Sequence, residues 1–313
     1  MKKYIGIDIG GTKCAVVLGD GEGNILEKVK FPTTTVTETL ERILTEAEKL
    51  KTDTTVSVGI SCGGPLDPKT GVIQSPPNLP GWDDIHITEM LTERFGVPAY
   101  MRNDANACAL AEWRYGAGKG TNNMIFLTFG TGMGAGLILN GALYSGTNGN
   151  AGEVGHMRLE RFGPVGYGKM GSLEGFCSGG GMAQLGKTLA ERHLQTGAKL
   201  PYRKEDITAK LLAEQARLGD PVALETFRIT GEKLGFALSL MIDMLNPEAI
   251  VIGSVFARSE DLLREHAERV ILEEALPQNS RVCRLLPAAL GEKIGDIAAL
   301  TVAAEGLRNE KLC

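Results

Sequence analysis

A strand–turn–strand motif with a turn of glycine and threonine occurs twice in this chain of 313 residues. The first copy covers residues 4–18 around the turn 10–13, and the second covers residues 124–139 around the turn 130–132. A hairpin signal follows each copy, Gly19-Asp20-Gly21 in one and Asn140-Gly141 in the other. The repeat predicts two related domains that face each other, with both turns pointing into one cleft.

The two turns are predicted to approach phosphate groups. Apolar and β-branched residues follow each turn, so the chain returns as a strand, whereas a dinucleotide-binding or P-loop turn opens a helix. Glycines in a hairpin let backbone N–H groups come close to phosphate oxygens. Thr12 adds a hydroxyl, Lys13 adds a cation, and Asp8 precedes the turn, where it could hold a phosphate-bound Mg²⁺ through water. Ordinary tight turns are the alternative, and a second copy of the motif weighs against it.

The composition excludes several classes of protein. Hydrophobic residues make up 43% of the chain and charged residues 23%, which is typical of a soluble globular protein long enough for two domains. A net charge of −5 argues against a general nucleic-acid binder. We find neither a signal-peptide pattern nor an apolar run of membrane-spanning length. Six scattered cysteines without a Cys-x-x-Cys pair indicate buried thiols in a reducing compartment, so the prediction is a cytoplasmic protein without a membrane partner.

Strands and helices alternate along the chain, which predicts an α/β fold. In the first part we expect a helix over 37–50 capped by Thr37, a strand over 55–60, a functional loop over 61–84, a helix over 88–95, a strand over 97–101 and a helix over 105–115. Residues 116–122 form a plausible boundary. In the second part we expect a long helix over 221–245 started by Asp220-Pro221, a strand over 249–252 and a helix over 295–307.

Asn103 and Asp104 lie at the carboxyl end of a predicted strand, where open α/β sheets place their sites. Both residues are also good helix N-caps, and a helix starts here. Only one of them can occupy the cap position, so the other is expected to face the cleft. A carboxylate there could accept a proton from a substrate hydroxyl as that hydroxyl attacks a γ-phosphate.

Glu153 and His156 lie on a glycine-rich segment that is predicted to be a loop, and Glu174 follows it. A lone histidine is more often a core or surface residue than a ligand. Carboxylates that accept from neighbouring hydroxyls, together with asparagine and histidine side chains, nevertheless form a set suited to a sugar.

These motifs together resemble the ROK family of bacterial sugar kinases and their repressor relatives over nearly the whole chain. The resemblance rests on the segments 8–13, 76–82, 102–107, 130–134 and 152–156. It implies a duplicated actin/hexokinase-like (ribonuclease H-like) α/β fold with ATP and sugar in the interdomain cleft. The expected domains are residues 1–118 and 119–295, with a C-terminal helix over 296–313 that packs back on the first domain.

The resemblance also implies ATP-dependent phosphorylation of a hexose at its 6-hydroxyl, with glucose as the default and Asp104 as the general base. The residues implied to bind the sugar are Gly64, Asn78, Asn103, Glu153, His156 and Glu174. The residues implied to bind the nucleotide are Asp8, Gly10, Gly11, Thr12, Lys13, Gly130, Thr131, Gly132, Gly179 and Gly253. Because only the first turn has an Asp before it and a Lys after it, we expect this turn to meet Mg²⁺ and the transferred phosphate more directly.

One departure from the family is predicted to matter. Many members carry the zinc motif Cys-x-Cys-Gly-x-x-Gly-Cys-x-Glu just after the histidine, and this chain has Val165, Tyr167 and Ser172 at the three cysteine positions. A Cys₃His site needs thiolates to bind Zn²⁺ tightly. We therefore predict no structural zinc, so that packing or hydrogen bonds must orient His156.

Several alternatives stay open at this point. The sugar could be another hexose, an N-acetylhexosamine or a β-glucoside, and the protein could be a sugar-binding regulator without catalysis. Repressors of the family carry an N-terminal winged helix-turn-helix, and here the first strand is reached by Tyr4, so none is expected. An acetate-kinase-like enzyme or a chaperone ATPase on the same fold would lack the Asn-Asp and Glu-x-x-His set. A homodimer is expected from the family.

Overall fold

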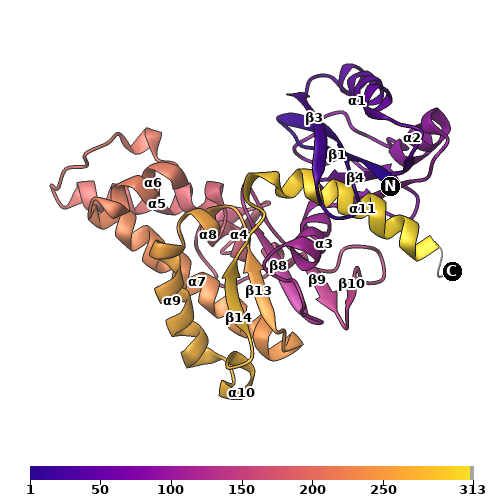
Figure 1. Cartoon of the computed structure of the whole chain (residues 1–313). Helices are drawn as coiled ribbons and strands as arrows, with labels where there is room; N and C mark the ends of the chain where they lie inside the picture. The colour runs from indigo at the N-terminus through magenta and orange to yellow at the C-terminus, as the bar shows by residue number, and fades with distance from the viewer. Residues whose placement is uncertain (311–313) are drawn as a thin grey trace.

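The computed structural model describes residues 1–310, so Cys313 and the last three residues of the expected segment 296–313 lie outside it. The described part forms two lobes, each built on a five-stranded mixed sheet (Figure 1). The first lobe contains β1 (Lys3–Ile9), β2 (Lys13–Gly19), β3 (Ile25–Pro32), α1 (Val36–Leu50), β4 (Thr55–Cys62), β5 (Leu66–Asp67), β6 (Val72–Ile73), α2 (Ile87–Phe95) and β7 (Ala99–Asn103), and α3 (Asp104–Tyr115) follows.

The second lobe begins with β8 (Met124–Phe129), β9 (Met133–Leu139), β10 (Ala142–Tyr144), η1 (Val154–His156), β11 (Val165–Gly166), β12 (Lys169–Met170), α4 (Leu173–Phe176) and α5 (Gly179–Gln195). It continues with η2 (Lys204–Asp206), α6 (Ala209–Arg217), α7 (Pro221–Leu245), β13 (Ala249–Ile252), α8 (Val255–Arg258), α9 (Glu260–Glu274), α10 (Pro277–Ser280), β14 (Arg284–Pro287) and η3 (Gly291–Lys293). The chain ends in α11 (Ile294–Glu310), which lies across the first lobe (Figure 1).

The two sheets repeat one topology. Their strand orders are β3-β2-β1-β4-β7 and β10-β9-β8-β13-β14. In each sheet the first three strands along the chain pair antiparallel, and the last two join in parallel register. The internal repeat of the sequence is therefore a repeat of the fold, and each glycine turn connects the first two strands of its sheet.

The lobes exchange one helix each. The alanine-rich helix α3 leaves the first sheet and packs on β8 and β9 of the second, while α11 leaves the second sheet and packs on β1 and β4 of the first. Glycines make this close packing possible: a Cβ at Gly59 would lie 2.1 Å from the carbonyl oxygen of Ala299, and one at Gly136 would lie 2.4 Å from the Cβ of Ala109. Because α3 and α11 also contact each other, the layers run sheet, α11, α3, sheet.

The structure corrects several predicted boundaries. Thr35, and not Thr37, caps α1, because its hydroxyl accepts from the backbone N–H of Glu38. Strand β7 lies two residues later than predicted, since its pairing with Val58–Cys62 sets its ends. The predicted loop 61–84 contains the short pair β5–β6, and the predicted loop at Glu153–His156 includes the 3₁₀ helix η1. The long helix α7 begins at Pro221 with Asp220 as its cap, as predicted.

Four of the cysteines are buried free thiols, namely Cys14, Cys62, Cys108 and Cys177, and Cys283 is half-buried. Within residues 1–310, no helix combines the length and the apolar character that crossing a membrane requires.

Candidate active site

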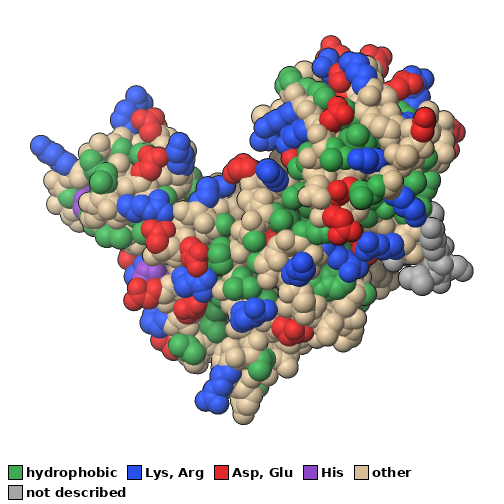
Figure 2. All heavy atoms as spheres, viewed as in Figure 1, with side chains coloured by type: hydrophobic (Ala, Val, Ile, Leu, Met, Phe, Trp, Pro, Cys, Tyr) green, Lys and Arg blue, Asp and Glu red, His purple; other side chains and the backbone are tan. Residues whose placement is uncertain are grey.

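A cleft of about 740 Å³ collects residues from both lobes. Figure 2 shows a deep notch in the surface between the lobe that carries α1 and α2 and the part that carries α5 and α6. Ten of the residues singled out in the sequence line the cleft: Gly64, Asn78, Asn103, Asp104, Gly130, Thr131, Gly132, Glu153, His156 and Glu174. The candidate sugar-binding residues Asn103, Asp104, Glu153, His156 and Glu174, called the acceptor set below, thus share one cavity with one of the two glycine turns.

Asn103 and Asp104 divide their tasks as expected. The Asn103 side chain caps α3, because its Oδ1 accepts from the backbone N–H of Asn106 at 2.9 Å. Asp104 begins the helix, and its Oδ1 accepts from the N–H of Ala105 at 2.8 Å. The capping bond fixes the chain at the junction of β7 and α3, so the Asp104 carboxylate is held in the cleft by backbone geometry.

The Asp104 carboxylate is reached by solvent through the mouth of the cleft, although protein crowds its other sides. This crowding by protein raises the pKa of Asp104 above its ordinary value, and the negative charge of Glu153 raises it further. A raised pKa moves a carboxylate towards the range in which it can take a proton from a hydroxyl and later release it.

Glu153 and His156 are placed by two glycines that dock their segment on β9. A Cβ at Gly152 would lie 2.1 Å from the carbonyl oxygen of Ala135, and one at Gly155 would lie 2.2 Å from that of Met133. The N–H of Ala135 also donates to the Gly152 carbonyl at 2.8 Å. Side chains larger than hydrogen at these two positions would push Glu153 and His156 away from the cleft.

Glu174 joins the acceptor set to the second glycine turn. Its Oε2 accepts from the backbone N–H of Met133 at 3.0 Å, and a Cβ at Gly132 would lie 2.9 Å from the same oxygen. The turn itself is closed by the N–H of Gly130, which donates to the Gly132 carbonyl at 3.1 Å. Glu174 therefore fixes where this turn stands relative to the other carboxylates.

The remaining sequence-predicted residues are absent from the cleft lining: Asp8, Gly10, Gly11, Thr12, Lys13, Gly179 and Gly253. Gly11 lies against the cleft residue Asn78, since a Cβ there would come within 2.3 Å of the Asn78 carbonyl oxygen. The N–H of Gly179 donates to the carbonyl of Gly130 at 2.8 Å, and Gly253 precedes Ser254, which does line the cleft.

Asp8 lies in a crowded acidic corner at the end of β1. Burial raises its pKa to about 6, and the charges of Asp296 and Asp104 add to the effect against the opposing Lys28 and Lys13. Asp296 belongs to α11 and forms an ion pair with Lys28. A carboxylate kept ionised here at neutral pH is a suitable ligand for a hydrated Mg²⁺, which usually binds proteins through one or two carboxylates and substrate phosphates.

Asp8→Asn is expected to stabilise the protein without ligands. Since the folded state holds the proton of Asp8 more tightly than the unfolded chain, the cost of ionising it grows as the pH rises from about 4 to 6. The variant should gain about 2–3 kcal/mol at pH 7.5, and about half of that at pH 5. Urea unfolding at both pH values measures the difference in the free energy of unfolding. An equal or lower stability of the variant at pH 7.5 would show that folding does not disfavour the ionised form of Asp8.

Several cleft residues were not singled out in the sequence as binding residues. Arg102 donates to the Met101 carbonyl at 2.8 Å, and burial lowers the pKa of its guanidinium. Among the described residues, the Oδ1 of Asn106 is buried without a hydrogen-bond partner. Arg102 and Asn106 lie in the same motif as Asn103 and Asp104, and this adjacency in the sequence could have predicted that they line the cleft. Tyr167 lines the cleft beside His156, and the sequence marked its position only as one at which many family members have a zinc-binding cysteine.

Comparison with known proteins identifies the class. The model of the ROK family matches residues 4–305. A glucokinase of Halalkalibacterium halodurans is 33% identical over 307 residues, covering 94% of this chain and 92% of that protein. The crystal structure of a ROK family glucokinase from Streptomyces griseus, in complex with glucose and AMPPNP, is 31% identical, has a TM-score of 0.80 and covers 97% of this chain and 100% of that one.

The Escherichia coli DNA-binding transcriptional dual regulator NagC is 29% identical over 283 residues, covering 87% of this chain and 68% of the regulator. The chain described here belongs to the ROK family. Its two lobes with matching sheets are the actin-like fold that ROK hexokinases share.

The family's zinc site does not fit this chain. Val165, Tyr167 and Ser172 supply no thiolate, and within residues 1–310 no three His, Cys, Asp or Glu side chains are grouped so that they could hold a metal ion. The contacts that the structure gives His156 are with protein groups, among them Lys169 and Tyr167.

Proposed function

We propose that the protein is a sugar kinase that transfers the γ-phosphate of ATP to the 6-hydroxyl of a hexose, with glucose as the first candidate. The observation that carries this proposal is the shared cleft, in which Asp104 lies with Glu153, His156, Glu174 and the second glycine turn. A base, a set of hydroxyl ligands and a phosphate-binding turn are the three parts that such a transfer needs.

On the acceptor side, Asp104 accepts the proton of the 6-hydroxyl while the hydroxyl oxygen bonds to the γ-phosphorus and the bond to ADP breaks. Its carboxylate must be ionised to do so, and its raised pKa means that acid inactivates it at a higher pH than an ordinary aspartate. Asn103, Glu153, His156 and Glu174 are proposed to bind the ring hydroxyls, with Gly64 and Asn78 lining the same pocket. In this arrangement the polar groups hold the sugar in one orientation.

On the phosphate side, backbone N–H groups of the turns 10–13 and 130–132 are proposed to bind the ATP phosphates, together with Thr12 and Lys13. Gly179 and Gly253 are proposed to lie near the base and the ribose. Mg²⁺, when bound with ATP, offsets the charge of the phosphates, and Asp8 is the residue proposed to hold it.

The relatives support this proposal. The name of the Halalkalibacterium halodurans protein and the ligands of the Streptomyces griseus structure concern glucose phosphorylation. NagC keeps the alternative of a sugar-binding regulator in view, because it matches most of this chain. Another hexose, an N-acetylhexosamine or a β-glucoside are the alternative substrates. We further propose domains 1–118 and 119–295, a homodimer, a cytoplasmic location, and no nucleic-acid or membrane partner.

The test is release of ADP from Mg-ATP with a panel of hexoses, N-acetylhexosamines and β-glucosides. The expected result is turnover that needs both sugar and Mg²⁺ and is fastest with glucose. Calorimetric titration with the same sugars separates the alternatives, since a regulator would bind a sugar and release no ADP. Failure of every sugar in both assays would contradict the proposal.

A further inference from the structure

The segment 157–173 connects His156 to Glu174 and carries the three positions at which many family members have zinc ligands. We propose that Tyr167 and Lys169, in the hairpin of β11 and β12, are positioning residues that hold His156 for the sugar in place of a metal ion. This inference rests on the proposed function, because it assigns His156 a sugar to bind.

Two contacts from the hairpin hold His156. The Nζ of Lys169 donates to the backbone carbonyl of His156 at 2.6 Å, which is a short, charge-assisted bond. The ring of Tyr167 meets the imidazole edge to face, with centroids 5.1 Å apart and planes at 88°. One contact fixes the backbone and the other fixes the ring, so together they do what a metal–nitrogen bond would do for the orientation of the imidazole.

The conformation of Tyr167 indicates a function for its ring. Its φ is +43°, in the left-handed region that is strained for a bulky residue, and 61% of its surface is exposed. Gly168 follows it and also has a positive φ, which glycine adopts without strain. A glycine at position 167 would likewise cost less than the tyrosine. The ring gains little from burial, lines the cleft and meets the imidazole of His156.

Hydrogen bonds fix the hairpin at two of the three positions where cysteines would stand, Val165 and Ser172, and at Met170. Gln184 of α5 binds the backbone of Val165 through both its amide atoms, at 3.0 and 2.9 Å. Ser172 donates to the Lys169 carbonyl at 2.9 Å and accepts from the N–H of Gly175, which caps α4. Arg158 donates to the Met170 carbonyl at 2.8 Å. The hairpin is thus held by protein groups on both strands.

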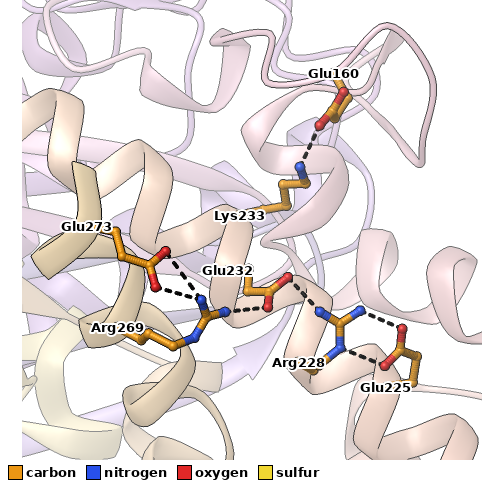
Figure 3. Close-up of polar contacts among 7 residues, drawn as sticks. All are labelled: Glu160, Glu225, Arg228, Glu232, Lys233, Arg269 and Glu273. Carbon is orange, nitrogen blue, oxygen red and sulfur yellow. Dashed lines mark hydrogen bonds and ion pairs between the residues drawn. The ribbon is translucent and has the colours of Figure 1, made fainter.

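One ion pair joins the far end of the segment to the helical layer, beside a separate network of ion pairs on α7 and α9 (Figure 3). Lys233 of α7 reaches Glu160 at 2.5 Å. On the same helix Arg228 pairs with Glu225 and Glu232, and Glu232 pairs with Arg269 of α9. The Glu160–Lys233 pair shares no residue with that network, and a single exposed pair contributes about 0–1 kcal/mol. The pair places Glu160 against α7, while the hydrogen bonds of Val165, Met170 and Ser172 hold the hairpin itself.

The decisive variant is Tyr167→Gly, with Tyr167→Phe as its match. Glycine removes the strain of the left-handed backbone conformation, so the Tm of Tyr167→Gly should equal or exceed that of the wild type. Loss of the ring contact should weaken the calorimetric affinity for the phosphorylated sugar by about three- to tenfold, with KM for ATP unchanged. Phenylalanine keeps the ring and should keep the affinity within about twofold. Lys169→Met should weaken sugar binding and leave zinc content unaffected.

A spectroscopic readout needs no sugar. The chain has four histidines, so the imidazole signals can be assigned, and the ring of Tyr167 should shift the signal of His156. The shift should disappear in Tyr167→Gly and persist in Tyr167→Phe. Unchanged sugar affinity in Tyr167→Gly, or near-stoichiometric zinc in untagged wild-type protein, would overturn the inference while the kinase proposal stands. A wild type that binds no sugar would overturn both.

Discussion

Asp104→Asn is expected to lower kcat by about 10²–10⁴-fold, the usual contribution of a general base. The amide has nearly the same shape as the carboxylate, and its oxygen can still accept from the N–H of Ala105. It cannot take the proton of the attacking hydroxyl. We therefore expect KM for ATP and the Tm to change little, since Asn103 still caps α3. Steady-state kinetics and a thermal melt measure both.

The matched control for this variant is Asp67→Asn, which replaces a carboxylate outside the cleft lining. Its kcat should stay within about twofold of the wild type, in line with surface substitutions elsewhere. A kcat of Asp104→Asn above a tenth of the wild-type value would assign the base to another group.

Glu112→Ala is expected to cause the largest loss of stability. Glu112 is fully buried at the end of α3, and its carboxylate accepts three backbone N–H groups, from Ala117 at 2.8 Å, Leu290 at 2.9 Å and Ala289 at 3.2 Å. These donors belong to the two connections through which the chain passes between the lobes. Without the carboxylate all three lose their partner in a buried place, which costs about 1–3 kcal/mol each.

We expect the Tm of Glu112→Ala to fall by about 10 °C or more. Glu112→Gln keeps the volume and one acceptor oxygen, so its loss should be about half as large. Glu41→Ala removes an exposed carboxylate of α1 and should change the stability by less than about 0.5 kcal/mol. Equal melting of Glu112→Ala and Glu41→Ala would show that the three bonds do not hold the connections together.

The repeated motif was the most informative part of the sequence, because strand, turn and strand are local patterns. Two hairpins at equivalent places predicted two equivalent sheets, and the strand orders confirm it. The same holds for Asn103 and Asp104, since a cap and its helix are neighbours in sequence. The α/β class and the ROK family followed from these features together.

Features that depend on distant partners could not be predicted. The end of β7 is set by its pairing with β4, and the bonds of Glu112 join residues 177 and 178 positions apart. The exchange of α3 and α11 depends on how alanines and glycines meet across the lobes. Tyr167 became visible only when the hairpin carried its ring to His156, because nothing in the local sequence calls for an exposed aromatic at a left-handed position.

The most direct test of the central claim is the ³¹P NMR spectrum of the product formed from glucose and Mg-ATP. Phosphate on the 6-oxygen couples to the two protons of C6, and phosphate elsewhere on the ring couples to one. The account predicts the coupling to two protons, with no product from Asp104→Asn in the same time. A product phosphorylated on a ring hydroxyl, or equal amounts of product from the variant, would contradict it.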